Sequence, residues 1–410
     1  MGEVYKNPYY EVTTHMRSAS FLVFLTALSV SGPLSINFFL ALLPAMADDF
    51  STNAATIQLT VSVYLIGFAG AQLVIGPLSD KFGRKPVLVY CYALFSLASL
   101  VCVFSTSAEL LIAARFIQSI GGCAGVLISR AIVRDVYSPK DMGKVMSYMI
   151  TGFSMAPLIA PAIGGFLGVH FGWRSLFIVF TVLGGGLMLW TLLGFEETNT
   201  KRNPHAFNLK ALFINYASLL LNKHFFGYFT VVSTSVAGVL TYTSASSFVL
   251  IEVLEVPAQY YGVLFSITAF GMFIGSIISA KLSGRYSSEI AAKNGVIFLF
   301  IGGLLMATLP LIGIVSITSI VGSMFIYAVG NGIVMPSAMS LAIMPFPKKT
   351  GAAAALIGFA QGALGALCGY IAGQLYNGTV IPMALTIGIL AVIACLGLLF
   401  SQSIKPQTST

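Results

Sequence analysis

Residues 56–86 read TIQLTVSVYLIGFAGAQLVIGPLSDKFGRKP, and this stretch decides the fold. Its first part, up to Ser79, carries no charged residue and is long enough for one helix to cross the hydrocarbon core of a bilayer. A charged segment, DKFGRK, follows directly at positions 80–85. An apolar run that ends in a short basic connection is typical of a membrane-spanning helix followed by a turn at the membrane surface.

The rest of the chain repeats this pattern. Of its 410 residues, 57% are hydrophobic and only 8% are charged, and the mean hydropathy is +0.92. Soluble globular chains carry about 25% charged residues. The composition therefore excludes a soluble globular protein and predicts an all-α integral membrane protein.

We expect twelve transmembrane helices in two six-helix, pseudo-symmetric halves. The crossings are expected near residues 19–45, 56–78, 86–106, 108–133, 144–168, 173–194, 225–250, 259–280, 291–312, 315–342, 351–375 and 380–402. The predicted organisation is an N-terminal segment at 1–18, a first half at 19–195, a linker at 196–224, a second half at 225–402 and a tail at 403–410.

The positive charges support this count and give an orientation. Among the 21 Lys and Arg residues, Arg115 and Arg130 fall inside crossings and Arg174 falls between the fifth and the sixth. The others lie on the termini, on the connections after even-numbered crossings, or within the first three residues of the crossing that follows such a connection (Lys144 and Lys293). The positive-inside rule makes that side cytoplasmic, so we expect both termini inside the cell and a multi-pass protein of the bacterial inner (plasma) membrane.

An internal repeat and the linker support two halves. A basic turn, KFGR at 81–84, follows the second crossing, and KLSGR at 281–285 follows the eighth. In the linker, apolar residues recur at helical spacing, which predicts an interfacial amphipathic helix; a partly disordered tether is the alternative. The apolar residues are Leu209, Leu212, Phe213, Tyr216 and Leu219.

The connection at 76–86 carries the first candidate mechanism. Gly76 and Gly83 permit a tight turn, and Arg84 can reach a carboxylate or free carbonyl oxygens. Asp80 and the segment ending in Arg134 and Asp135 offer partners. We predict a charge cluster joining crossings two, three and four that holds one conformational state; a short loop with solvated charges is the alternative.

Two further features lie inside crossings. A charged side chain inside the bilayer costs free energy, so Arg115 is expected to face the protein interior. There it contacts substrate, a proton carrier or polar groups of the first crossing, or it acts only as a structural organiser. Pro157 and Pro161 lie four residues apart and precede Gly164 and Gly165. They predict a bent, closely packed helix that can pivot or seal a leak.

These residues resemble the major facilitator superfamily in its twelve-helix drug:H⁺ antiporter branch, closest to bicyclomycin- and chloramphenicol-resistance exporters. The residues that carry the resemblance are 76–86, Arg115-Phe116-Ile117-Gln118, 129–137, 157–165 and Glu197-Thr198. The resemblance implies alternating access, with a substrate cavity between the halves near the bilayer midplane.

One departure from that pattern concerns coupling. Similar exporters carry an acid in the first crossing, directly after a Pro-Leu-Ser-Ile-like stretch, but residues 33–39 read PLSINFF and place Asn37 there. An amide does not exchange a proton at ordinary pH. None of the 13 acidic residues falls near mid-membrane by this segmentation, and the acids that remain to be considered are Asp80, Asp135 and Glu252.

The predicted substrate site combines polar and adaptable apolar side chains near mid-depth. Its members are Asn37, Tyr64, Arg115, Met149, Phe153, Tyr242, Thr243, Tyr327, Asn331 and Gln361. Without a buried carboxylate we expect neutral or zwitterionic amphipathic cargo, or anionic groups drawn to Arg115. For each residue, plain helix packing is the alternative.

The sequence gives no sign of an enzyme, a metal site or a cofactor. Its four histidines lie in or beside connections, no catalytic cluster or phosphate-binding loop is present, and the five cysteines have no metal-ligand spacing. We expect a monomer that contacts the lipid bilayer and a small amphipathic substrate, with protons as the candidate coupling ion and no nucleic acid.

Three functions remain at this point. The first is an exporter of small amphipathic compounds driven by proton antiport. The second is an importer or facilitator of a small metabolite on the same fold, which Asn37 favours. The third is a membrane sensor that transports nothing.

Overall fold

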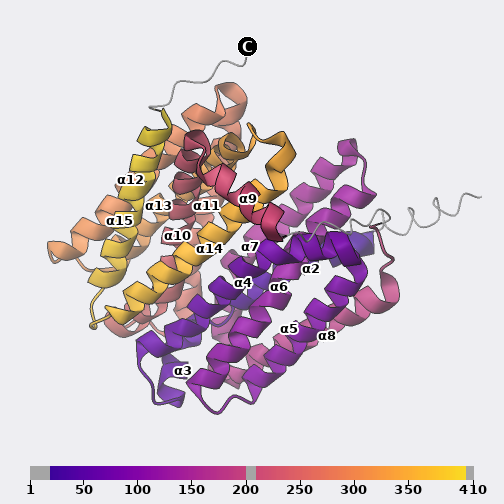
Figure 1. Ribbon diagram of the computed structural model, residues 1–410. Helices are drawn as coiled ribbons and strands as arrows, with labels where there is room; N and C mark the ends of the chain where they lie inside the picture. Colours follow the sequence, from indigo (N-terminus) through magenta and orange to yellow (C-terminus); the bar gives the residue numbers. More distant parts are fainter. Residues whose placement is uncertain (1–18, 200–208, 403–410) are drawn as a thin grey trace, which may run out of the picture.

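The computed structural model describes residues 19–199 and 209–402, so the predicted N-terminal segment, the tail and part of the linker lie outside the described residues. Every element in these ranges is a helix (Figure 1). The first half comprises α2 (Ala19–Asn37), η1 (Leu40–Leu42), α3 (Leu43–Asp49), α4 (Ala54–Phe82), α5 (Arg84–Val103), α6 (Ala108–Val136), α7 (Pro139–Phe171) and α8 (Arg174–Gly194). The linker contains α9 (Leu209–Leu220), and the second half comprises α10 (Lys223–Ser247), η2 (Phe248–Val253), α11 (Ala258–Arg285), α12 (Ser288–Leu311), α13 (Ile317–Ile343), η3 (Pro347–Lys349), α14 (Thr350–Gln374) and α15 (Ile381–Gln402).

Twelve helical spans in the described ranges are long and apolar enough to cross a membrane, as the sequence predicts. Polar residues just before several helices set where they start, because a side-chain oxygen there accepts a free backbone N–H of the first turn. Asn53, Ser107, Ser138, Asn222, Ser287 and Ser316 cap α4, α6, α7, α10, α12 and α13 in this way.

The two halves repeat one packing plan. In the first half α6 packs on α4, α5 and α2, while α5 also packs on α8 and α2 on α7. In the second half α13 packs on α11, α12 and α10, while α12 also packs on α15 and α10 on α14. The same five helix pairs therefore recur, and Figure 1 shows the halves as two bundles set at an angle.

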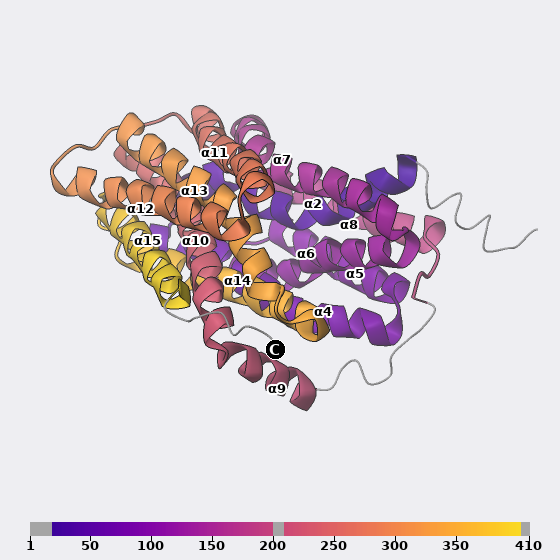
Figure 2. The same cartoon turned by 90° about the horizontal axis from the view of Figure 1, so that it is seen from above.

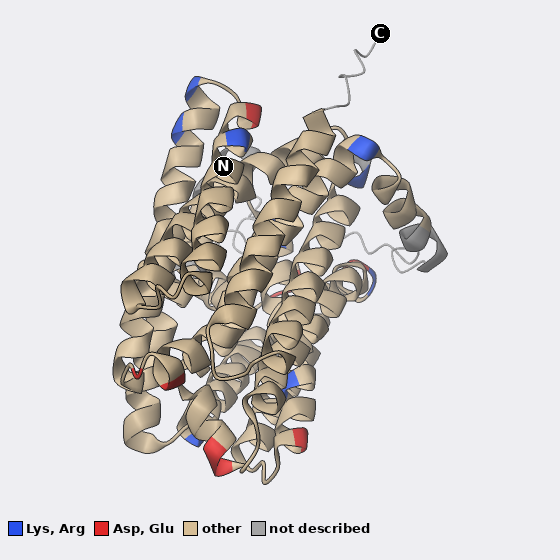
Figure 3. Ribbon diagram, turned by 90° about the vertical axis from the view of Figure 1, so that its left-hand side faces the viewer, with Lys and Arg blue, Asp and Glu red and all other residues tan. Residues whose placement is uncertain are grey.

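The halves meet mainly through two pairs of helices. α4 lies along α14, and α7 lies along α11. α9 lies beside α14 and α10, at the edge of the bundle in Figure 2. We call the end that carries α9 and the α4–α5 turn the basic end, and the end that carries α3 the far end. In Figure 3 the charged residues gather toward the ends of the bundle, with few between them.

The structure corrects the predicted boundaries in two places. The first crossing is not one helix, because α2 ends at Asn37 and the chain continues through η1 into α3. The stretch 76–86, predicted as a connection with a tight turn, is almost entirely helical: α4 runs to Phe82 and α5 starts at Arg84. Gly76 lies inside α4, and the turn consists of Gly83, whose φ of 108° disfavours any side chain.

The predicted linker helix is present as α9, and its last turns lie against the second half. Leu219 is completely buried, and Ser218 accepts a hydrogen bond from Lys349 Nζ at 2.7 Å. Burial raises the pKa of the Tyr216 hydroxyl above its usual value. The side chains of Leu209, Leu212 and Phe213 lie outside the described part of the structure.

Candidate functional site

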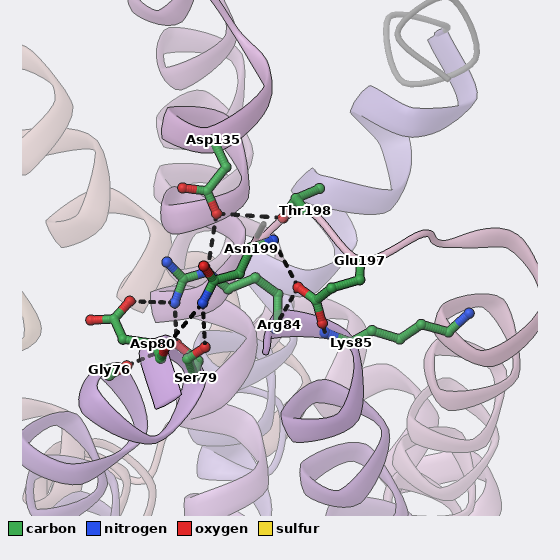
Figure 4. A network of polar contacts seen from close by, with 9 residues as sticks. All are labelled: Gly76, Ser79, Asp80, Arg84, Lys85, Asp135, Glu197, Thr198 and Asn199. Carbon is green, nitrogen blue, oxygen red and sulfur yellow. Dashed lines mark hydrogen bonds and ion pairs between the residues drawn. The ribbon is translucent and has the colours of Figure 1, made fainter. Parts of the chain in front are cut away.

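Arg84 is the centre of a polar network at the basic end (Figure 4). Its guanidinium donates to Asp80 Oδ1 and to Ser79 Oγ, both at 2.6 Å, and to Asp135 Oδ2 at 3.1 Å. Arg84 is only 4% exposed, so these partners replace its hydration. The network joins α4, α5 and α6, which are the crossings that the predicted charge cluster was expected to join.

Glu197 ties the end of the first half to the same place. Its two carboxylate oxygens accept the backbone N–H groups of Arg84 at 2.9 Å and Lys85 at 3.1 Å, at the N-terminus of α5 (Figure 4). A carboxylate here satisfies free donors and interacts favourably with the helix dipole. A Cβ atom at Gly83 would overlap the Glu197 carboxylate, so this approach also requires glycine.

Asn199 and Thr198 extend this contact. Asn199 Nδ2 donates to the carbonyl oxygens of Ser79 at 3.2 Å and Asp80 at 3.0 Å, and Thr198 Oγ1 donates to Asp135 Oδ2 at 3.4 Å. In the sequence, Glu197 and Thr198 contribute only to the family resemblance, and they were not predicted to belong to the charge cluster. No local pattern indicates a contact across this separation in sequence, so only the fold reveals it.

Of the two other predicted members, Arg134 stays outside the network, whereas the Gly76 carbonyl oxygen accepts the Ser79 hydroxyl at 2.9 Å (Figure 4). Arg134 is exposed and makes no hydrogen bond or ion pair among the described residues. A Cβ atom at Gly76 would meet nothing within 4 Å, so this glycine is not required by close packing. The gating roles of Gly76, Asp80, Arg84, Arg134 and Asp135 stay predictions.

Arg115 is completely buried in the first half. Its Nη2 donates to the carbonyl oxygen of Ser35 at 2.9 Å, and its Nη1 donates to Gln118 Oε1. The guanidinium carbon lies 4.3 Å from the ring centre of Phe39 and 4.2 Å from that of Tyr64, within the range of cation–π attraction. Protein groups thus enclose the guanidinium in this conformation.

These contacts stabilise the break in the first crossing. Because α2 ends at Asn37, the Ser35 carbonyl receives the Arg115 N–H where an uninterrupted helix would supply a backbone donor. Asn37, at 6% exposure, donates from Nδ2 to the Pro33 carbonyl at 2.8 Å. Asn37 therefore completes the local hydrogen bonding of the helix end.

Tyr64 belongs to the same cluster. Its hydroxyl accepts from Ser35 Oγ at 2.5 Å and donates weakly to the Gly32 carbonyl at 3.3 Å. Asn37, Tyr64 and Arg115, predicted from separate crossings to line a substrate site, are all buried here and hydrogen-bonded to α2 or to groups near it.

In the second half Tyr327 and Asn331 of α13 bond to α10. The Tyr327 hydroxyl donates to the carbonyl oxygens of Thr234 at 3.3 Å and Ser235 at 3.1 Å, and Asn331 Nδ2 donates to Ser235 Oγ at 3.2 Å. Both residues are buried. The pair α13–α10 is the counterpart of α6–α2, so each half joins these two helices by a polar bond to a backbone carbonyl.

The remaining predicted residues differ in how their polar atoms are used. Thr243 Oγ1 donates to Val239 in its own helix at 2.8 Å, and Gln361 Nε2 donates to Met335 Sδ at 3.4 Å. Tyr242 is 1% exposed and stacks on Phe265, yet its hydroxyl has no partner among the described residues. Met149 is 2% exposed, and the Phe153 side chain lies outside the described part.

The proline pair of α7 lies against α11. The backbone of Pro161 and Ala162 approaches Gly262 so closely that a Cβ atom there would overlap it, and Ser266 Oγ donates to the Leu158 carbonyl. α7 is therefore closely packed at 158–162, as the sequence predicts, and its partner belongs to the other half. The pivoting or sealing role of Pro157 and Pro161 stays a prediction.

The acidic residues lie away from the middle of the crossings, as the sequence predicts. Every acidic residue in the described ranges lies near the end of a helix, and none lies in the middle of a span. Glu252, at the far end, accepts the Tyr376 hydroxyl at 3.0 Å. Burial, and then this bond, raise the pKa of Tyr376, so the phenol stays a donor at neutral pH.

Known proteins resemble this chain along nearly its whole length. The Major Facilitator Superfamily profile matches residues 19–370. An MFS-type transporter of Bacillus subtilis, YdgK, is 33% identical over 373 residues, covering 90% of this chain and 92% of the relative. A bicyclomycin resistance protein homolog of Haemophilus influenzae is 29% identical and covers 93% of this chain and 96% of its own.

Further relatives and a solved structure agree. Multidrug resistance protein D of Escherichia coli is 28% identical over 84% of this chain and 86% of its own. The crystal structure of a bacterial homolog of the human lysosomal transporter Spinster, in an inward-facing and unoccupied conformation, superposes with a TM-score of 0.69 at 15% identity. It covers 97% of this chain and 98% of that one, which shows the shared fold.

Proposed function

Since the chain belongs to the major facilitator superfamily, we propose that it exports small amphipathic compounds across the membrane by alternating access of its two halves. The observation that carries this proposal is the full-length similarity to proteins named for multidrug and bicyclomycin resistance. The two-bundle fold, with only two main helix pairs between the halves, suits a rocking motion.

The orientation follows from charge. The basic end carries the α4–α5 turn, α9 and Lys349, so the positive-inside rule makes it the cytoplasmic side. Both termini then lie in the cytoplasm and α3 lies outside. The proposed location is the bacterial inner membrane, and the proposed oligomeric state is a monomer.

The conformation described here faces inward in this proposal. The close approaches between the halves lie at the far end and the middle: α7 meets α11 at Ala162 and Gly262, and α4 meets α14 from Gln58 to Gln72. The far end is thus closed by direct packing between halves. Arg84 and its partners join helices of the first half only, so this network sets the shape of that half at the cytoplasmic end.

Cargo contacts are assigned to the mid-depth residues, with Tyr242 foremost. Its buried hydroxyl has no partner within residues 19–199 and 209–402, which is unfavourable unless a ligand or water supplies one. Gln361 and Met149 add a polar and an adaptable apolar contact. Arg115 reaches cargo only if the packing within the first half changes, because aromatic rings and Ser35 of that half enclose it here.

Protons are the proposed coupling ion, although Asn37 replaces the acid that similar exporters carry. The acids available to exchange protons are Asp80 and Asp135 at the basic end and Glu252 at the far end. Asn37 also favours a second candidate, an importer or facilitator of a small metabolite that equilibrates without a proton gradient.

Flux in proteoliposomes tests these proposals. Purified protein is reconstituted with imposed pH or Na⁺ gradients, and uptake of neutral, cationic and anionic amphipathic compounds is followed. Transport that stops when the pH gradient collapses supports the exporter. Gradient-independent equilibration identifies the facilitator, and no flux for any compound rejects both.

A further inference from the structure

One continuous seam joins the two halves along α4 and α14. On α4 it consists of Gln58, Ser62, Ala69 and Gln72, and on α14 of Gly373, Gly369, Gly362 and Gly358. We call this contact the α4–α14 seam. The two helices are antiparallel, so each residue named on α4 lies opposite the glycine named at the same place in the α14 list. The contact extends from the far end past the middle of the bundle.

The glycines make this seam exceptionally close. Cβ atoms at Gly373, Gly362 and Gly358 would overlap Gln58, Ala69 and Gln72 respectively. At Gly369 a Cβ atom would overlap Ser244 of α10 and would lie 3.7 Å from Ser62 Oγ. Since α14 contributes no side chain at these positions, the α4 side chains alone set the chemistry of the seam.

That chemistry is unfavourable in the closed conformation. Gln58 and Ser62 are 1% and 2% exposed, and Gln58 Oε1 and Ser62 Oγ have no hydrogen-bond partner among the described residues. Ser244, which faces the same place from α10, is satisfied by the Leu240 carbonyl at 3.0 Å. The unpaired atoms therefore belong to the α4 side of the contact between halves.

Under alternating access the α4–α14 seam is part of the outer gate, and we propose that Gln58 and Ser62 keep this gate able to open. In the closed state Gln58 Oε1 and Ser62 Oγ are buried without a hydrogen-bond partner among the described residues, which destabilises that state. When the halves separate at the far end, water hydrogen-bonds these atoms. Close glycine packing favours closure and unpaired polar atoms oppose it, so the two states stay near in free energy. This inference rests on the alternating access proposed above.

The direct test removes the polar atoms at nearly constant size. The variant Gln58→Met with Ser62→Ala is compared with the parent and with Gln374→Met, an exposed position at the end of α14 that lies outside the seam. Because the change removes unpaired buried atoms, the variant is expected to unfold at a higher temperature than the parent. A variant that unfolds at a lower temperature contradicts the proposal.

Electron–electron distance measurements report the gate without any cargo. In a background lacking the native cysteines, spin labels at Glu109→Cys and Asn377→Cys span the far end, and labels at Gly143→Cys and Glu289→Cys span the basic end; all four positions are exposed. We expect the population with the open far-end distance, relative to the population with the closed one, to fall about tenfold in the double variant. The basic-end pair changes in the opposite sense, and Gln374→Met leaves both ratios unchanged.

A second variant shifts the same equilibrium the other way. Gly373→Ala places a methyl group against Gln58, so the open fraction is expected to rise. Gly351→Ala, whose methyl group meets nothing within 4 Å, serves as its control. An open fraction that does not fall in the Gln58→Met, Ser62→Ala variant, or does not rise in Gly373→Ala, overturns the inference.

These outcomes are separable from failure of the proposed function. If the labels report two states whose ratio ignores the seam variants, alternating access stands and the seam inference fails. If they report one distance in every variant and at every pH, alternating access fails and the inference fails with it. If two states respond as expected but no compound is transported, the seam is a gate and only the cargo assignment fails.

Discussion

Glu197 Oε1 accepts the backbone N–H of Arg84 at 2.9 Å, which fastens the end of the sixth crossing to the start of the third. The side chain of Arg84 is held at the same time by Asp80 and Asp135. One residue thus receives contacts from α4, α6 and the segment after α8 (Figure 4). The basic end of the first half is therefore one connected unit.

Replacing Glu197 by Ala should destabilise the protein by about 1–3 kcal/mol, because two N–H groups of the α5 N-terminus lose their acceptor. Glu197→Gln should cost less, since an amide oxygen still accepts but its negative charge at the helix N-terminus is lost. Thermal unfolding in detergent measures both. Glu196→Ala, at an exposed neighbouring position, is the control, and equal effects at 196 and 197 would contradict the assignment.

Asp135→Asn should slow transport more than it weakens cargo binding. The change keeps an oxygen near Arg84 but removes a charge from a network that biases a conformational equilibrium. We expect turnover to fall about tenfold and the Kd for cargo to change less than about twofold. Asp141→Asn, an exposed carboxylate in the first turn of α7, is the control. A variant that loses binding while keeping turnover would show that the network is not a conformational element.

Arg115→Met should lower stability by about 2–4 kcal/mol, because Ser35 O and Gln118 lose a donor and two aromatic rings lose a cation. Arg115→Lys should rescue only part of this, since an ammonium lacks the planar fork that reaches both acceptors. Chemical unfolding and cargo binding are measured together. Normal stability with selective loss of anionic cargo would instead assign Arg115 to the substrate site.

Asn37→Asp should give transport a steeper pH dependence. The Pro33 carbonyl beside position 37 accepts a hydrogen bond, so an ionised carboxylate there is disfavoured and a protonated one is favoured. The new group can then gain and lose a proton as its surroundings change. Initial rates are compared across pH in both proteins, and superimposable profiles would show that the first crossing has no coupling role.

Tyr242→Phe distinguishes packing from cargo contact. If the hydroxyl serves no ligand, its removal should leave stability unchanged or raise it by about 1 kcal/mol, because a buried group without a partner is lost. If Tyr242 contacts cargo, as proposed above, the variant should show this unchanged or raised stability and also bind cargo more weakly. Unfolding temperature and cargo affinity are measured side by side. Unchanged affinity for every transported compound would return Tyr242 to the packing residues.

Much of the fold was predictable because it depends on local properties. Hydrophobic runs of bilayer length and the polar residues before them determine where helices lie, and both can be read along the chain. One of the two exceptions has a local cause. The turn after α4 was predicted too long because Gly76 and Gly83 look alike in sequence, whereas only Gly83 adopts a positive φ. The break after Asn37 carries no such marker.

The candidate site was less predictable, because sequence gives residue type and depth but not the direction in which a side chain points. Arg115 and Tyr64 were expected to line a cavity separately, yet they stack on each other. Tyr242 and Tyr327 looked equivalent, yet within the described part of the chain the Tyr327 hydroxyl has acceptors and the Tyr242 hydroxyl has none. The glycines of α14 pack against α4, and nothing in the sequence of residues 351–375 identifies that helix as their neighbour.

The sequence by itself determined that this chain spans a membrane about twelve times, and it placed the basic connections on one side, since transfer of each segment into lipid depends on its own residues. Tertiary structure alone decided which buried polar atoms are paired. Glu197 reaches Arg84, and Gln58 meets a glycine that offers no partner, because helices distant in sequence pack together. Hydrogen bonding in a dry interior depends on such neighbours, so it cannot be read from one segment at a time.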